Sequence, residues 1–139
     1  MSLLIGSSLA LLLAAADVPP AALAAVGASY EGPVAQAFEA HCADCHGKLP
    51  ASLAEPARTA ATKKSRRAHK KLDMDKGFPF ASKWELSKLM TEIRKSVADG
   101  DMPPAKYQKQ KGTPMPDADR KVVVDWATTA EAQLGRPPR

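Results

Sequence analysis

The sequence predicts one all-α domain of about four helices. Apolar residues recur at helical spacing in several segments, and no segment shows the apolar–polar alternation of a β-strand or repeats another. The chain has 139 residues, the length of a single domain, and aromatic residues make up only 5% of it. A chain of this size buries a modest core, so a large apolar cofactor at its centre would supply what the core lacks.

Periodicity and end signals place the four helices. They are predicted from Pro33 to Ala43, from Pro56 to Leu72, from a capping box at Ser82–Glu85 to Val97, and from Asp117 to Leu134. Gly100 is expected to end the third helix. One face of the last helix is apolar and collects Val123, Trp126, Ala127, Ala130 and Leu134.

Residues 1–28 are predicted to lie outside the domain, which then spans residues 29–139. The run from Leu3 to Ala16 has no charge and is shorter than a membrane span of about 20 residues, but it suits the apolar region of a secretory signal. Small residues at Ala14–Ala16 or Ala22–Ala24 would allow cleavage. No Lys or Arg precedes the run, so the alternatives to a cleaved signal are a start further upstream, a poor signal or a loose membrane anchor. We expect a protein that is periplasmic or otherwise exported.

The chemistry is concentrated in the stretch Cys42-Ala43-Asp44-Cys45-His46, which holds both cysteines of the chain. Cys-x-x-Cys-His is the attachment motif of a c-type haem. Two thiols three positions apart can each reach one vinyl group of the porphyrin, and the following histidine is then carried under the iron. The motif therefore predicts one haem c bound covalently through Cys42 and Cys45, with His46 as an iron ligand.

Two other kinds of site use a Cys-x-x-Cys pair. A thioredoxin-like dithiol needs a βαβ context, which the sequence does not show. A structural zinc site needs four ligands, and only His41 and His69 remain as nitrogen donors. His41 is expected at the surface. Haem is the favoured interpretation, and zinc binding and dithiol chemistry are the alternatives.

A second iron ligand is expected at Met102. Pro103 and Pro104 follow it, and their fixed φ angles stiffen the segment so that the thioether can meet the iron. Ligation by His and Met raises the reduction potential and suits electron transfer. Met115 and His69 are rival ligands, and a methionine that only fills a gap in the core is the structural alternative.

Four aromatic residues are expected to contact the cofactor: Phe38, Phe78, Phe80 and Trp126. Phe38 lies on the helix face that ends at Cys42, where packing is its expected role. Phe78 and Phe80 belong to a short irregular loop, and we expect them to cover an edge of the haem.

The segment from Arg58 to Lys71 is rich in Lys and Arg and has no acidic residue, in a chain whose net charge is +5. One interpretation is a docking face for an acidic redox partner or for anionic lipid, and the other is a solvated helix face. Nucleic acid is not an expected partner, because the chain carries an export-like segment and this stretch has no interleaved aromatics. The N-terminal segment is a second candidate for membrane association.

Taken together, the Cys42–His46 motif, the Met-Pro-Pro at Met102 and the late Trp126 resemble the small monohaem c-type cytochromes of class I. In particular, the chain resembles bacterial haem-binding domains with a CxxCH…MPP…Trp pattern, over Tyr30 to Leu134. The resemblance implies a cytochrome c-like fold wrapped around the haem, with His46 as proximal and Met102 as distal ligand.

The resemblance also implies contacts. Phe38 matches an aromatic residue that precedes the first cysteine by four positions, and the first and last helices of that fold cross, which would set Phe38 against Trp126. The crossing usually has a small residue eight positions before that cysteine, where this chain has Val34. The basic segment is longer than in minimal members.

The function implied is that of an exported carrier of single electrons between redox partners. An enzymatic activity is not expected, because two axial ligands leave no open position at the iron. The alternatives are a haem ligand-binding or peroxidase-like protein with an open distal site, and a haem subunit docked on a larger respiratory complex through Arg58–Lys71.

Overall fold

The structure, a computed structural model, describes residues 18–52 and 54–135. These residues form seven helices: α1 Pro20–Tyr30, α2 Pro33–His41, α3 Ala43–His46, α4 Ala57–Lys71, α5 Leu86–Ala98, α6 Ala105–Lys111 and α7 Asp117–Leu134. The described part has no β-strand, only an isolated bridge between Asp73 and Ala81. The all-α prediction is therefore confirmed. The count exceeds four because α1, α3 and α6 were not expected as helices.

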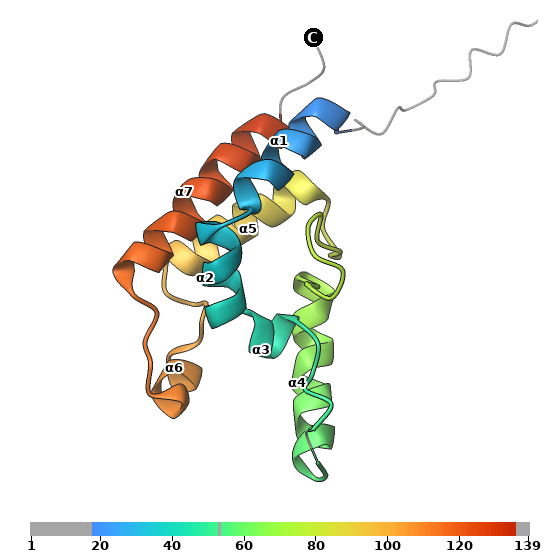
Figure 1. Ribbon diagram of the computed structural model, residues 1–139, viewed down its shortest axis with the longest axis vertical. Helices are drawn as coiled ribbons and strands as arrows, with labels where there is room; N and C mark the ends of the chain where they lie inside the picture. Colours follow the sequence, from blue (N-terminus) through green and yellow to red (C-terminus); the bar gives the residue numbers. More distant parts are fainter. Residues whose placement is uncertain (1–17, 53, 136–139) are drawn as a thin grey trace, which may run out of the picture.

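One layer of the molecule is a bundle held by apolar contacts. α5 lies along α7, and α1 and α2 pack against α7 as well (Figure 1). All five residues of the predicted apolar face of α7 are buried. From α5, the buried residues are Leu89, Met90, Ile93 and Val97, whose spacing of three and four places them on one face. The helical period seen in the sequence therefore sets which faces meet in the core.

Helix α1 occupies a segment that was predicted to lie outside the domain. Val26 of α1 is fully buried, and the indole Nε1 of Trp126 donates to its carbonyl over 3.4 Å. Gly32, at φ 76°, turns the chain between α1 and α2, a conformation that glycine adopts readily. The boundary expected between residues 28 and 29 thus lies inside a packed helix.

The expected secretory run from Leu3 to Ala16 lies outside the described residues. None of the helices in the described part is long and apolar enough to cross a membrane.

Helices α3, α4 and α6 extend from the other side of the bundle, and α4 forms a long arm (Figure 1). α3 is the main helix neighbour of α4, whose only buried residue is Ser65. α6 has no buried residue. This second part of the molecule is therefore held by few apolar contacts.

The predicted capping box at Ser82–Glu85 is not formed. α5 begins at Leu86, and no side chain caps its N-terminus. The Ser82 hydroxyl instead donates to the carbonyl of Lys71 over 2.5 Å and accepts from the backbone N–H of Trp84 over 3.1 Å. Ser82 is thus bound to the end of α4, and its hydroxyl joins the two segments that border the candidate site.

Candidate functional site

A cavity of about 340 Å³ lies between α2, α3, α4, α5 and the segment that follows α5. Five residues predicted to bind the cofactor line it: Phe38, Cys42, Cys45, His46 and Met102. Apolar wall is added by Leu72 and by the α5 residues Leu89, Ile93 and Val97. Such a volume is in the range of small-molecule and cofactor sites.

The motif forms a single tight turn. Cys42 follows α2, and its carbonyl accepts from the backbone N–H groups of Cys45 and His46 over 3.2 and 3.0 Å. Both cysteines are free thiols. This turn brings the two thiols and the imidazole to the same cavity, which the spacing of the motif predicts.

The imidazole of His46 is oriented by a carbonyl that the sequence does not reveal. His46 is buried, and its Nδ1 lies 2.8 Å from the carbonyl oxygen of Leu72, at the end of α4. Because a carbonyl only accepts, Nδ1 carries the proton, and Nε2 keeps its lone pair for a metal. Burial lowers the pKa of His46, outweighing the hydrogen bond to Leu72, so the ring is neutral at pH 7.

The two thiols do not have the electrostatics of a reactive dithiol. Burial raises the pKa of Cys42 to about 12, and burial also raises the pKa of Cys45. Catalytic Cys-x-x-Cys pairs instead have a lowered thiol pKa, because the thiolate is the nucleophile. The raised thiol pKa values therefore fit cysteines that bind a cofactor covalently better than they fit a redox-active dithiol.

Met102 is the only methionine of the described residues that lines the cavity. Its backbone N–H donates to the carbonyl of Ser96 over 3.0 Å, and Gln108 donates to the carbonyl of Pro103 over 2.7 Å. Met115 is buried elsewhere, with its N–H bonded to the Gln108 side chain over 2.9 Å. The geometry favours Met102 over Met115 as a ligand.

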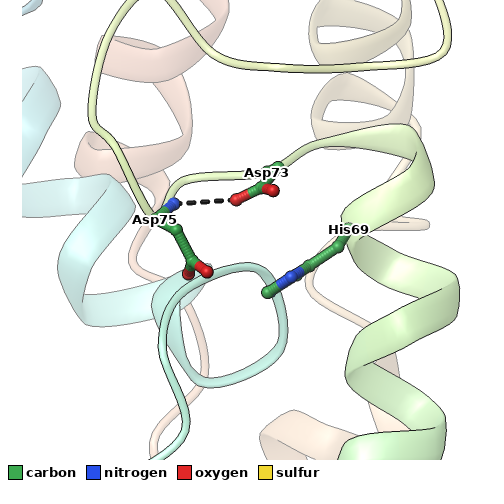
Figure 2. A group of neighbouring side chains, drawn as sticks. All are labelled: His69, Asp73 and Asp75. Carbon is green, nitrogen blue, oxygen red and sulfur yellow. Dashed lines mark hydrogen bonds between the residues drawn. The ribbon is translucent and has the colours of Figure 1, made fainter.

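His69, the other rival ligand, does not line the cavity. Its Nε2 lies 3.0 Å from the carbonyl of Gly47 and 3.1 Å from the hydroxyl of Ser65. Figure 2 shows its ring directed toward Asp73 and Asp75, and the Asp75 N–H donates to the Asp73 carboxylate over 2.9 Å. Through the Gly47 carbonyl, His69 supports the turn that carries His46.

His69, Asp73 and Asp75 also bear on whether the cysteines could bind zinc. Within the described part of the chain, His69, Asp73 and Asp75 form the one group of three His, Cys, Asp or Glu side chains close enough to share a metal ion. Neither cysteine belongs to it. A tetrahedral zinc site needs four ligands around one ion, so the geometry of the thiols does not favour zinc.

His41, expected at the surface, is largely buried and lines the cavity. Its Nε2 lies 2.8 Å from the Asp119 carboxylate on α7, and its side chain is only 12% exposed. The sequence did not indicate this contact, because Asp119 lies 78 positions away. His41 thus ties the end of α2 to α7.

The structure corrects the role expected of three aromatic residues. Phe78, Phe80 and Trp126 do not line the cavity and instead surround Tyr30, with ring centroids 5.2 to 5.9 Å away. Phe38 joins this cluster on one side and the cavity on the other, and its ring lies 5.6 Å from Trp126 in an edge-to-face contact. The implied contact of Phe38 and Trp126 is present although Val34 is buried at the crossing. Burial of apolar rings against each other explains why the loop packs inward.

Two features of the site could not be predicted from the sequence. Trp84 lines the cavity, which its place in the predicted capping box did not indicate. Tyr107 of α6 lines the cavity as well. Its hydroxyl donates to the carboxylate of Asp44 over 2.6 Å, and the ammonium of Lys111 lies 3.4 Å from the same carboxylate. The helix that follows Met102 is thereby connected to the residue between the two cysteines.

The donor set fits a haem. Two neutral thiols, one neutral imidazole with a free Nε2 and one thioether border a largely apolar cavity, and these groups suit covalent attachment and iron ligation in a porphyrin. A site for a hard cation such as Mg²⁺ or Ca²⁺ would need oxygen ligands instead.

Comparison with known proteins agrees with this geometry. The haem-binding domain family matches residues 17–129, a range that includes α1. No curated protein and no solved structure matches the chain. Since the matched range holds the motif, the cavity and most of α7, the chain belongs to the haem-binding domain family.

Proposed function

We propose that this protein is an exported monohaem c-type cytochrome that carries single electrons between redox partners. The observation that carries the proposal is the meeting of Cys42, Cys45, His46 and Met102 at one largely apolar cavity. The haem, when bound, supplies a one-electron couple at its iron.

Each residue has a distinct role in this proposal. The thiols of Cys42 and Cys45 would hold the haem through thioether bonds to its two vinyl groups, and because each bond would place sulfur on one carbon and hydrogen on the other, no oxidant would be needed. His46 offers Nε2 because the Leu72 carbonyl holds the proton at Nδ1. Met102 would offer its thioether from the segment that follows α5, where Pro103 and Pro104 limit its motion.

The protein is not an enzyme in this proposal, because His46 and Met102 would both hold the iron and would leave no position on it for a substrate. Export and a periplasmic location are supported by the apolar run of residues 3–16. Because Val26 is buried in the domain, removal of a leader is expected upstream of α1, at Ala14–Ala16, and not at Ala22–Ala24. The exposed cations of α4 suit an acidic redox partner.

The test is the visible spectrum of the full-length, haem-loaded protein, oxidised and reduced. The wild type is expected to be low-spin with the weak red iron–sulfur band, and Met102→Ala is expected to lose that band. Met115→Ala is the matched control and should keep it.

Other outcomes contradict specific parts of the proposal. A band that survives in Met102→Ala and disappears in Met115→Ala would assign the ligand to Met115. A high-spin wild type that binds carbon monoxide would favour a ligand-binding or peroxidase-like protein. Absence of covalent haem from the wild type would overturn the proposal as a whole.

A further inference from the structure

Three cations of α4 face the candidate haem cavity. Lys64, Arg67 and Lys71 are spaced by three and four positions, which places them on one side of the helix. All three line the cavity, although each is exposed, so they lie at its rim. We call these three residues the inner row.

No ion pair of the described residues involves the inner row. The one carboxylate on the cavity wall is that of Glu92, and it pairs with Lys88 over 2.7 Å. His41, the second histidine on the cavity wall, pairs with Asp119. Lys71 still acts electrostatically on the Glu92 carboxylate. The rim of the cavity therefore carries three cations that form no ion pair with the described part of the chain.

A haem is an apolar macrocycle that carries two carboxylate side chains. A site for it needs apolar walls, and cations near the carboxylates lower the cost of removing them from water. The cavity combines apolar α5 residues with the cations of α4. Arg67 can bind a carboxylate with two parallel N–H groups, and the lysines act as point charges.

We infer that the inner row binds the carboxylate groups of the haem and raises its reduction potential. The inference rests on the proposed function, because it requires a haem in the cavity. Positive charge near the iron favours the reduced state, which carries one positive charge fewer than the oxidised state. α4 then serves two purposes: its carbonyl end orients His46, and its inner row neutralises the cofactor's acidic groups.

The same helix offers a matched control. Lys63, Arg66 and Lys70 repeat the residue types and the spacing of the inner row one position earlier, are exposed and do not line the cavity. We call them the outer row. Replacing either row by glutamine removes the same charge from the same helix, so a difference between the two variants reports position and not net charge.

The experiment compares Lys64→Gln/Arg67→Gln/Lys71→Gln with Lys63→Gln/Arg66→Gln/Lys70→Gln in the haem-loaded, full-length chain. At a fixed solution potential, the ratio of reduced to oxidised haem is expected to fall roughly threefold to tenfold in the inner-row variant, because three exposed cations beside the haem carboxylates are lost. In the outer-row variant the ratio is expected to fall less than about twofold. The resonance Raman bending bands of the haem carboxylate side chains should shift only in the inner-row variant.

Equal ratios and unchanged carboxylate bands in the two variants would overturn the inference, while a low-spin spectrum with the iron–sulfur band in both would leave the proposed function intact. Absence of covalent haem from the wild type would overturn both. If the triple variant fails to fold, Arg67→Gln alone is expected to lower the ratio and Arg67→Lys to restore most of it; identical ratios in these two and the wild type would again overturn the inference.

Discussion

The two parts of this molecule are held together by different forces. In the bundle of α1, α2, α5 and α7, large apolar side chains such as Phe38, Leu89 and Val123 are almost fully buried against one another. In α3, α4 and α6, the only buried residues are His46 and Ser65, and polar contacts such as Tyr107 to Asp44 connect the elements. The bundle can therefore be stable on its own contacts, whereas the second part borders a cavity that a cofactor would fill.

This difference has a consequence for the candidate site. The motif lies where the two parts join, with Cys42 at the end of α2 and His46 in α3. Attachment of a haem at this point would link the second part to the bundle and replace missing apolar contacts. The stability of α4 and α6 is then expected to depend on the cofactor far more than that of α7.

The largest effect is expected from Cys42→Ala/Cys45→Ala. Without thiols there is no covalent haem, and amide hydrogen exchange should lose protection in α3, α4 and α6 while α5 and α7 keep most of theirs. Lys48→Gln, an exposed change just after the motif, is the control and should keep the haem and the protection. Equal loss of protection in both parts would show that the bundle also depends on the cofactor.

A smaller effect is expected in the bundle from Val26→Ala. Val26 is fully buried among apolar side chains, so its truncation should lower the free energy of unfolding by about 2 kcal/mol. Denaturant unfolding of the haem-loaded protein measures it, with the exposed change Ala25→Ser as control. An effect below about 0.5 kcal/mol, the size expected of a surface change, would mean that α1 is not part of the folded domain.

In the second part, Tyr107→Phe should cost less. It removes one hydrogen bond to the exposed Asp44, so the expected loss is roughly 0.5 kcal/mol. A double-mutant cycle with Asp44→Ala isolates the pair. A coupling free energy near zero would show that α6 is held by other contacts. With Met102 as the proposed iron ligand, faster displacement of its thioether by added imidazole in Tyr107→Phe would show that the bond restrains the Met102 segment.

The smallest effect is expected from the ion pair between Arg94 of α5 and Glu131 of α7, whose atoms lie 2.8 Å apart. The hydrogen bond from Arg94 lowers the pKa of Glu131. Since the folded-state pKa is lowered, the pair stabilises the bundle above the unfolded-state pKa, and this contribution is lost as the pH falls through the folded-state pKa. The thermal midpoints of wild type and Arg94→Gln should differ slightly at pH 7, and the difference should shrink as the pH falls below the usual pKa of a glutamate, 4.5. A difference that grows as the pH falls would contradict this.

Much of the fold could be predicted because helical period and core position coincide. The faces of α5 and α7 are buried as their spacing indicates, and α4 ends within one residue of the prediction. The errors have specific causes. The Ala-rich residues of α1 are compatible both with a cleaved leader and with a helix. The hydroxyl of Ser82 bonds to the carbonyl of Lys71 and does not cap α5.

The sequence by itself determined the chemistry of the motif and the helical faces. Both depend on residues a few positions apart, whose relative placement follows from the geometry of one helical turn. Only the tertiary structure decided that Leu72 orients His46, that Met102 lines the cavity while Met115 does not, and which row of α4 cations faces it. These contacts join residues far apart in the chain, and their geometry depends on how the intervening segments fold and pack.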